Sequence, residues 1–294
     1  MKLSFTTLDV FTSTSYAGNP VAIIKVPASE SASLTQKQKQ SIASEFNLSE
    51  IVFLHLPTEG TTTSKERKID IFTSIAEVPF AGHPTIGTSH YLLHTTGQNI
   101  HTITTKAGPI PISIDLDTNN VQAEIAHDFH IHSITHPSPL NGRENPVVSI
   151  VNGMSFILVS LPDLESLVKA NVNLNGNAYD PSSLDEGWKN GIVGTMYYVS
   201  RGADEFGRNA YRTRMFGSRE DPGTGSASSG LGCYLASLEG NESSQGPLRF
   251  AFVQGVEMGR RNEIAVDVTK GERGIEKVML SGAAVKVMEG TLEI

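Results

Sequence analysis

Cysteine is nearly absent from the sequence. Cys233 is the single one, so no disulfide can form within the chain, and this usage is typical of a protein of the reducing cytoplasm. Positive charge is also scarce, because 23 lysines and arginines stand against 31 aspartates and glutamates, which gives a net charge of −8. This balance argues against a nucleic acid or an anionic membrane as the partner. It leaves room for a small anion held by backbone N–H groups.

Long hydrophobic runs are missing as well. The longest, residues 156–159, is far too short to span a bilayer. The N-terminus has neither a sustained apolar core nor a small-residue cleavage site, so we expect no signal peptide. With 294 residues, the chain is long enough for one large domain or two ordinary ones. We therefore expect a cytoplasmic globular protein.

The sequence does contain one stretch rich in glycine and hydroxyl groups, residues 220–235, which reads E-D-P-G-T-G-S-A-S-S-G-L-G-C-Y-L. Glycines allow the backbone to turn sharply and to approach a ligand closely. A helix that begins just behind them would direct its free N–H groups, and the positive end of its dipole, toward a bound anion. An ordinary surface loop is the alternative interpretation of such a cluster.

This stretch occurs twice. A shift of 143 positions superimposes residues 77–92 on residues 220–235 with the common pattern E-x-P-x-x-G-x4-G-x3-Y-L. The preceding segments, 68–72 and 211–215, both alternate like strands. The shift is about half the chain, which predicts two pseudo-equivalent α/β halves, each with a strand, a glycine turn and a helix N-terminus.

Alternating patterns and turn residues predict the remaining elements. A helix is expected over 34–46, with Ser33 as its cap, and another over 163–170. A helix is also expected behind each glycine turn, and a mixture of loop and helix over 174–191. A polar hairpin loop is expected at 57–68. Strands are expected at 5–11, 21–26, 51–54, 69–72, 103–114 (a pair), 121–136 (a strand and its exit), 147–161, 192–199, 248–254, 263–268 and 278–288.

Glu50 is the most suggestive carboxylate. It stands between a polar turn and the apolar strand at 51–54, so part of its surroundings should be dry. Desolvation raises the pKa of a carboxyl group toward neutrality, which suits a group that takes and returns protons. A strand-edge or helix-capping acid is the alternative.

Three further residues at the glycine turns are candidates. His83 follows Gly82 at the expected helix start and could exchange a proton with a ligand, or simply cap the helix. Asp221 could be a general base or a helix cap. Ser226 overlies His83, but no G-x-S-x-G elbow surrounds it, so we favour a hydrogen bond to a ligand over a nucleophilic role.

Other features carry weaker signals. Histidines 127, 130, 132 and 136 suggest a metal, but neither H-E-x-x-H nor a partner cysteine is present, so we favour a solvated strand edge and predict no metal. Cys233 is expected to be packed inside a helix. The glycine turns match neither nucleotide-binding motif, G-x-x-x-x-G-K-[ST] or G-x-G-x-x-G.

Five blocks of the sequence together resemble the PhzF family of phenazine-biosynthesis-like proteins, whose fold is shared with diaminopimelate epimerase. They appear in the family's order and extend from residue 18 to residue 260. The blocks are Gly18-Asn19-Pro20-Val-Ala, Asn47-Leu-Ser-Glu50, Pro79-Phe-Ala-Gly-His83-Pro-Thr-Ile-Gly87, Asp221-Pro-Gly-Thr-Gly-Ser226 and Gln254-Gly255-x-x-Met258-Gly259-Arg260.

The resemblance implies an α+β type of α/β fold, with two pseudo-symmetric halves, each a mixed β-sheet wrapped around a central helix. It also implies an active site in the cleft between the halves and a last strand that returns to the first domain. We accordingly expect a first domain of residues 1–118 plus 280–294 and a second of residues 119–279.

The resemblance also implies the activity. The member that gives the family its name isomerises a dihydro-hydroxyanthranilate by proton transfer, without cofactor or metal. Its acid/base glutamate corresponds to Glu50, and its supporting residues correspond to His83 and Asp221. The substrate carboxylate would be held by Gly82, Gly225 and Ser226, and the matching blocks add Gly18, Asn19 and Ser49 as substrate-binding candidates. A homodimer is the family expectation.

The chain departs from related patterns in informative places. Epimerases of this fold use two cysteines, and Ala81 and Pro222 stand at about those positions here. Proline commonly follows Phe-Thr in the family but is absent after Phe72-Thr, and Tyr16 replaces a common Phe. We predict a cofactor-free isomerase of a small carboxylic acid. The alternatives are an amino-acid-like epimerase without thiols and a non-catalytic small-ligand binding protein.

Overall fold

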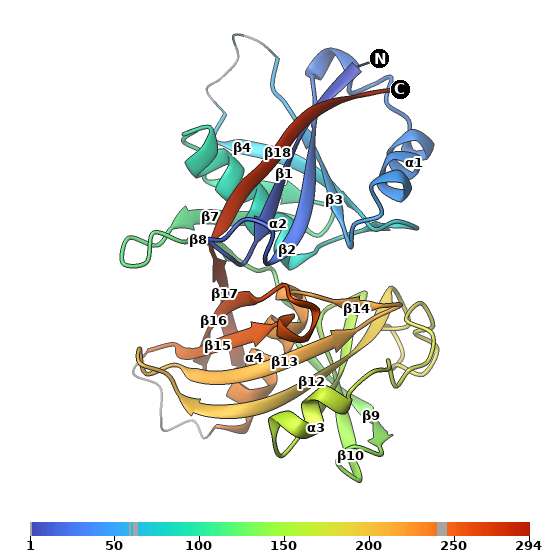
Figure 1. The fold of residues 1–294 in the computed structure, drawn as a ribbon, viewed down its shortest axis with the longest axis vertical. Coiled ribbons are helices and arrows are strands. Elements are labelled where there is room, and N and C mark those ends of the chain that lie inside the picture. Colours follow the sequence, from blue (N-terminus) through green and yellow to red (C-terminus); the bar gives the residue numbers. More distant parts are fainter. Residues whose placement is uncertain (1, 59, 61–63, 240–245) are drawn as a thin grey trace. The chain divides into compact units, whose positions relative to one another are not determined.

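A computed structural model describes residues 2–58, 60, 64–239 and 246–294 of the chain. Within it the chain folds into two compact units, Met1–Glu124 together with Ser281–Ile294, and Ile125–Leu280 (Figure 1). No helix in the described ranges combines the length and apolar character that crossing a membrane requires. The units are described in turn.

The first unit contains a mixed sheet. Its strands pair in the order β18-β1-β2-β3-β4-β6-β7-β8, with the short β5 added to β4. β2–β3 and β4–β6 are parallel pairs, and the other pairs are antiparallel. β18 runs beside β1, with Lys2 opposite Glu293, so both ends of the chain belong to this unit (Figure 1). The strands are β1 (Lys2–Val10), β2 (Asn19–Val26), β3 (Ile51–His55), β4 (Glu66–Phe72), β5 (Glu77–Val78), β6 (Thr102–Thr105), β7 (Gly108–Ile114), β8 (Val121–Glu124) and β18 (Ala284–Glu293).

Helix α1 (Gln36–Phe46) connects the parallel strands β2 and β3. Its N-cap is Thr35, whose side chain accepts a hydrogen bond from the Gln38 backbone while the Gln38 side chain accepts one from the Thr35 backbone. The prediction of Ser33 as the cap was therefore wrong, because the helix begins two residues later and the reciprocal capping box forms at Thr35. Ser33 instead donates to the carbonyl of Glu30, in the 3-10 turn Ala28–Glu30.

Helix α2 (Gly82–His90) forms the centre of the first unit, and a π-helical turn (Tyr91–Thr95) extends it. It packs on β1, β2, β3 and β8, whereas α1 packs on β3 and β4. The first four residues of β3 are all buried because helices cover both faces of this strand. A Cβ atom on Gly87 would lie 2.8 Å from the side chain of Val21, so glycine is what allows α2 to approach the sheet this closely.

The second unit repeats this arrangement. Its strands pair in the order β9-β10-β11-β12-β13-β15-β16, with the short β14 added to β13. β11–β12 and β13–β15 are parallel, and the other pairs are antiparallel. The strands are β9 (His130–Ser138), β10 (Arg143–Val151), β11 (Met154–Ser160), β12 (Ile192–Ala203), β13 (Asn209–Phe216), β14 (Glu220–Asp221), β15 (Leu248–Gln254), β16 (Asn262–Gly271) and β17 (Gly274–Gly282).

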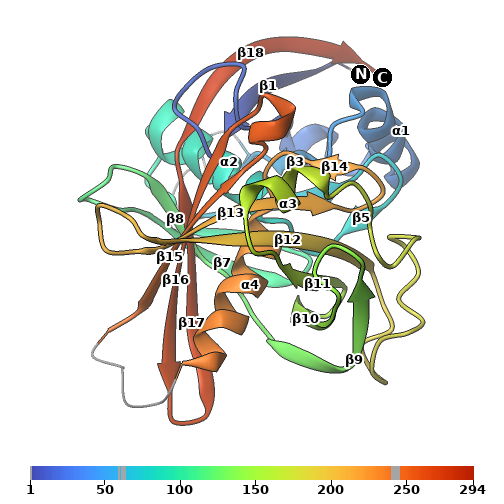
Figure 2. The same cartoon turned by 60° about the horizontal axis from the view of Figure 1, so that its bottom comes forward.

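Helix α4 (Gly225–Leu238) is the central helix of the second unit and packs on β10, β11, β15 and β16 (Figure 2). Helix α3 (Leu164–Lys169) packs instead on β12 and β13, and Asp163 caps it as an acceptor from the Ser166 backbone. A 3-10 turn (Val256–Met258) follows β15. Buried side chains of β10, β11 and β12 form a core with Leu167 and Leu184, so these strands are covered on both faces.

Three sequence-based boundaries differ from the structure. Residues 174–191 contain turns and no helix, because Asn173, Asn177 and Asp180 accept hydrogen bonds from the backbone two residues ahead and favour turns over a helix. The single strand expected over 278–288 is interrupted at Ala283, between β17 and β18. The expected hairpin loop at 57–68 lies partly outside the described residues, and β4 already begins at Glu66.

The sequence repeat corresponds to a repeat of topology, which confirms the predicted fold class. In each unit a strand, a two-residue strand, a central helix and a strand parallel to the first follow one another, as β4-β5-α2-β6 and as β13-β14-α4-β15. The helices begin at Gly82 and Gly225, 143 residues apart as predicted. The strands before the two helices are related by a shift that is one residue larger than that of the helices. Phe72, which pairs with Glu77, corresponds to Phe216, which pairs with Glu220, so the first unit has one more residue between the paired positions.

Candidate active site

Glu50 and His83 lie together in the first unit. α1 ends at Phe46, and the left-handed φ of 50° at its C-cap, Asn47, turns the chain toward β3. Glu50 is the last residue before that strand. His83 is the second residue of α2. Its Nδ1 atom lies 3.5 Å from Oε2 of Glu50, and the side chains are 3% and 16% exposed. The structure therefore places a largely dry carboxylate against an imidazole.

His83 is neutral in this environment. Burial lowers the pKa of its imidazole to about 3, although a hydrogen bond to the backbone of Pro20 acts in the opposite direction. Its Nε2 atom is buried and has no hydrogen-bond partner within the described part of the chain. A buried polar atom without a partner is costly, and such atoms are often found where a ligand binds.

The N-terminus of α2 leaves backbone donors beside this pair. The N-cap is Ala81, and no side chain of the described residues caps the helix. Pro84 has no N–H, so Gly82 and His83 supply the donors of the first turn. Donors of this kind, together with the positive end of the helix dipole, favour a bound anion.

The other first-unit candidates surround Glu50. The side chain of Ser49 donates to Oδ1 of Asn19 across 3.2 Å, and Asn19 is buried at the start of β2. Gly18 has a φ of +67°, and a Cβ atom there would lie 2.3 Å from the carbonyl of Val10. Gly18 thus permits the tight turn that brings Asn19 to Ser49 and Glu50.

In the second unit, Asp221, Gly225 and Ser226 gather at the N-terminus of α4. Asp221 lies in β14, and its carboxylate accepts a short hydrogen bond from the hydroxyl of Thr224. Thr224 is the N-cap, but its side chain forms no hydrogen bond to the described helix backbone. Gly225 and Ser226 form the buried first turn. As in the first unit, a carboxylate thus accompanies a helix N-terminus without a side-chain cap.

Sequence reasoning assigned no role to two residues that build this second N-terminus. Oε1 of the buried Gln254 accepts from the Thr224 backbone, 3.1 Å away, and its Nε2 donates to the Asp221 carbonyl at 2.7 Å. Nδ2 of Asn262 donates to the Pro222 carbonyl at 2.6 Å. The block beginning Gln254-Gly255 was the available signal. Gly255 belongs to the same turn, because a Cβ atom there would lie 2.4 Å from the Pro222 carbonyl.

The histidine-rich segment forms the strand β9, most of whose residues are exposed or half-buried as expected, and His132 is the histidine that departs from the expected solvated edge. His132 is only 5% exposed, because β9 pairs with β10 and the ring packs inward against Ser149. His127 hydrogen-bonds the carbonyl of Ile275, away from His132. Cys233 is buried in α4, which confirms its predicted packing. Burial raises the pKa of its thiol well above the ordinary value.

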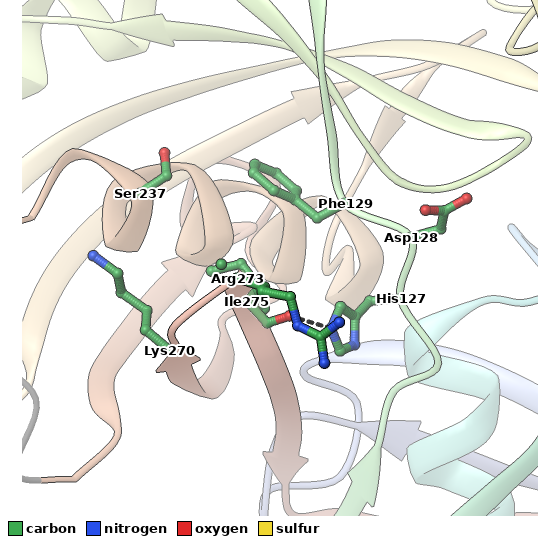
Figure 3. A pocket seen from close by; sticks show the side chains of 8 residues that line it. His127, Asp128, Phe129, Ser237, Lys270, Arg273 and Ile275 are labelled. Atoms are coloured by element: carbon green, nitrogen blue, oxygen red, sulfur yellow. Dashed lines mark hydrogen bonds between the residues drawn. The ribbon is translucent and has the colours of Figure 1, made fainter. Parts of the chain in front are cut away.

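One surface hollow of the second unit lies apart from the candidate residues. It has a volume of about 420 Å³ and none of the predicted site residues line it (Figure 3). Lys270, Arg273, His127 and Ile275 are among the residues that line it, and Figure 3 marks the hydrogen bond between His127 and the Ile275 carbonyl. The Nζ atom of Lys270 donates to the carbonyl of Glu239, so this cation is already engaged.

Comparison with known proteins identifies the family. The family model described as phenazine biosynthesis-like protein (PhzC-PhzF) matches residues 8–290, and the chain therefore belongs to this family. An uncharacterised isomerase of Pasteurella multocida is 30% identical over 281 residues, which cover 90% of this chain and 86% of that protein. Trans-2,3-dihydro-3-hydroxyanthranilate isomerase of Pseudomonas fluorescens is 28% identical over 310 residues and covers 98% of this chain and 99% of that protein.

A solved structure agrees with this assignment. The phenazine biosynthesis protein of the PhzF family from Bacillus anthracis superimposes with a TM-score of 0.72 and 23% identity, and each chain is covered completely. The family model thus confirms the predicted family, and the superposition confirms the predicted fold. The names of the relatives place the chain among isomerases, as the sequence predicted.

Proposed function

We propose that this chain is a cofactor-independent isomerase that moves a proton on a small, cyclic or unsaturated carboxylic acid, with Glu50 as the general acid and base. The observation that carries the proposal is the position of Glu50, 3.5 Å from a buried neutral imidazole at the uncapped N-terminus of α2. The name of the Pseudomonas fluorescens relative supports the type of reaction and suggests dihydro-hydroxyanthranilate as the first substrate to test.

The candidate residues of the first unit can each take a separate role in this reaction. The N–H groups of Gly82 and His83 are suited to hold a substrate carboxylate and to stabilise negative charge that develops next to it. Glu50 would then remove a proton from an adjacent carbon and return it at another position. Because His83 stays neutral, it adds no competing positive charge, and its ring can orient the Glu50 carboxylate or relay a proton.

The type of substrate follows from the chemistry available. Proton abstraction from carbon needs a C–H bond that is already acidified when only side chains assist. A conjugated ring or double bond next to the carboxylate provides this, and a simple amino acid does not. We therefore favour unsaturated cyclic acids over free amino acids. Ser49 and Asn19, next to Glu50, are proposed to bind polar groups of the same ligand.

The second unit is proposed to serve the same reaction. Asp221 accompanies the N-terminus of α4, as Glu50 accompanies that of α2, and Gly225 and Ser226 provide first-turn N–H groups. Removing the Asp221 carboxylate should therefore lower turnover. The test is Asp221→Asn beside Asp117→Asn, which alters an exposed acid outside both helix N-termini.

The decisive experiment follows solvent deuterium into the substrate by NMR. The panel consists of dihydro-hydroxyanthranilate and related cyclic carboxylic acids, tested with wild type, Glu50→Gln and Glu45→Gln. Glu45 is an exposed acid near the end of α1 and is the matched control. We expect Glu50→Gln to slow exchange by roughly 10²–10⁴-fold with binding retained, and Glu45→Gln to behave as wild type.

Three other outcomes would contradict part of this proposal. Ligand binding without exchange in wild type and variant alike would contradict an isomerase of these acids and favour a binding protein. Deuterium entering the α-carbon of an amino acid, with loss of optical purity, would favour an epimerase instead. Exchange that persists undiminished in Glu50→Gln would remove Glu50 from the acid/base role.

A further inference from the structure

His130 and His132 leave β9 on the same face, and Asp185, from the segment between α3 and β12, lies against both rings. Nε2 of His130 is 2.8 Å from Oδ2 of Asp185, and Nδ1 of His132 is 3.7 Å from the same oxygen. One ligating atom from each of the three side chains lies within 4.8 Å of the others. None of these residues takes part in the proposed isomerase chemistry.

Hydrogen bonds from neighbouring groups hold the side chains of His132 and Asp185 in place. Nδ1 of His132 accepts from the Asp185 backbone at 3.3 Å, so the ring proton is on Nε2 and is donated to the hydroxyl of Ser149 at 2.8 Å. The Ser133 hydroxyl donates to Oδ1 of Asp185, and the Ser133 backbone N–H is shared between Oδ1 at 3.2 Å and Oδ2 at 3.1 Å. A second ring nitrogen that donates to a fixed acceptor is characteristic of metal-binding histidines.

The group is buried on one side and open on the other. The side chain of His132 is buried against Ser149. A cation can reach the group because the side chains of His130 and Asp185 are 33% and 24% exposed.

We propose that His130, His132 and Asp185 bind one divalent transition-metal ion of the zinc class, through Nε2, Nδ1 and Oδ2, with water completing the coordination. Two imidazoles and one carboxylate suit Zn²⁺, Co²⁺ and Ni²⁺ better than Ca²⁺ or Mg²⁺. Tetrahedral bonds of about 2.0–2.2 Å separate neighbouring ligand atoms by roughly 3.3 Å. The observed separations of 2.8 Å and 3.7 Å lie on either side of that value.

The bound ion would fasten residues 174–191, which have no helix or strand, to β9. It would take the place of the proton between His130 and Asp185 and of the hydrogen bond from the Asp185 backbone to His132. The inference is independent of the isomerase proposal, because neither Glu50 nor Asp221 is involved.

The chain contains a built-in reporter of this site. Trp188, the single tryptophan of the sequence, stacks on the ring of His130 with the centroids 4.7 Å apart and the planes 10° apart. It also meets the ring of His132 edge-on at 5.9 Å. Co²⁺ or Ni²⁺ held by these imidazoles would quench the indole fluorescence.

The experiment uses the full chain without an affinity tag, stripped of metal with a chelator. Co²⁺ and Ni²⁺ are titrated while Trp188 fluorescence and the visible absorption of Co²⁺ are recorded, and Zn²⁺ affinity is measured by competition with a chromophoric chelator. We expect saturable quenching at one equivalent, and at least a tenfold loss of affinity in His130→Gln and in Asp185→Asn. His136→Gln, which alters a half-buried histidine of β9 outside the group, should bind as wild type.

Two results would overturn the proposal, namely no saturable binding to wild type, or equal affinities in wild type and Asp185→Asn. Thermal unfolding separates a lost site from a damaged fold. Zn²⁺ should raise the unfolding temperature of wild type and of His136→Gln but not that of Asp185→Asn. An increase of the same size in Asp185→Asn would also contradict a site that includes this carboxylate.

Discussion

The side chain of Gln254 ties the end of β15 to the N-terminus of α4. Its Oε1 accepts from the Thr224 backbone at 3.1 Å, and its Nε2 donates to the Asp221 carbonyl at 2.7 Å and to the Thr224 hydroxyl at 3.0 Å. Gln254 has no exposed surface. The amide of Gln254 thus helps to fix the turn that presents Asp221, Gly225 and Ser226, together with Asn262, which donates to the Pro222 carbonyl.

Replacing Gln254 by leucine should destabilise the protein by roughly 2–4 kcal/mol. The substitution keeps the side-chain volume but leaves the Thr224 N–H and the Asp221 carbonyl without their buried partner, and unsatisfied buried groups are expensive. Denaturant unfolding measures the loss. Deuterium exchange into the substrate should slow as well, because the hydrogen bond from Gln254 no longer fixes the position of Asp221.

Gln122→Leu is the matched control. Gln122 is a half-buried residue of β8, and its replacement should change the free energy of unfolding by less than about 0.5 kcal/mol. Similar losses in the two variants would show that the hydrogen bonds of Gln254 are not what stabilises this turn.

His83 should make stability fall in acid. Its folded pKa of about 3 lies below the ordinary 6.5, so between these values the unfolded chain binds a proton that the folded chain does not. Stability must then decrease as the pH is lowered from 6.5 toward 3, by up to about 1.4 kcal/mol per pH unit from this residue. His83→Asn should flatten the dependence of the unfolding free energy on pH, measured by urea unfolding between pH 7.5 and 4.

The comparison concerns slopes, because His83→Asn also changes packing at every pH. His101→Asn removes an exposed histidine of the same unit and should keep the wild-type slope. A wild-type slope retained in His83→Asn would mean that the acid sensitivity comes from other groups.

Much of the fold could be predicted from the sequence because its signals are local. The two glycine turns predicted α2 and α4, and the repeat predicted that each would occupy the same place in its half. The cap of α1 was missed because Ser33 and Thr35 are chemically alike and each has a glutamine three residues later, so the sequence does not distinguish them. The absence of a helix at 174–191 depends on Asx-type hydrogen bonds whose competition with a helix cannot be weighed from composition.

The candidate site was less accessible to local reasoning. Glu50 precedes a strand and His83 begins a helix, and only the fold brings their side chains within 3.5 Å. Local sequence context made each of them a candidate, the resemblance to a family favoured them over the alternatives, and their roles stay predictions. Gln254 and Asn262 had no assigned role, because hydrogen bonds to a distant turn leave no periodic pattern. The contact of His132 with Asp185 was missed for the same reason.

Gly18 should tolerate no side chain. Its φ of +67° is unfavourable for other residues, and an added Cβ would lie 2.3 Å from the Val10 carbonyl and 2.6 Å from the Thr12 side chain. Gly18→Ala should therefore lower the free energy of unfolding, measured with denaturant, by roughly 2–4 kcal/mol. Gly97→Ala is the control, since Gly97 has a φ of +61° with open space around it. This substitution should lower the free energy of unfolding by only about 1 kcal/mol. Equal costs would mean that the backbone angle alone, and not the close approach, sets the requirement.

Lysine should not be able to replace Arg214, because the guanidinium group forms several directed hydrogen bonds in addition to an ion pair. Its Nε and Nη2 donate to the two oxygens of Glu220 at 2.7 Å and 2.8 Å, and its Nη1 donates to the Val168 carbonyl at the end of α3. Lysine preserves the charge but cannot reproduce this planar fork. Arg214→Lys should reduce the unfolding free energy by about 1–3 kcal/mol.

The control for Arg214→Lys is a pair that has the same chemistry but is exposed to solvent. Arg261 and Glu263 are 53% and 68% exposed, so Arg261→Lys should change stability by less than about 0.5 kcal/mol. Glu220 precedes Asp221 in β14, so the loosened strand in Arg214→Lys should also slow deuterium exchange, whereas Arg261→Lys should not. If the two variants lost equal stability, the charge of Arg214 would be sufficient and its fork would have no special part in holding β14.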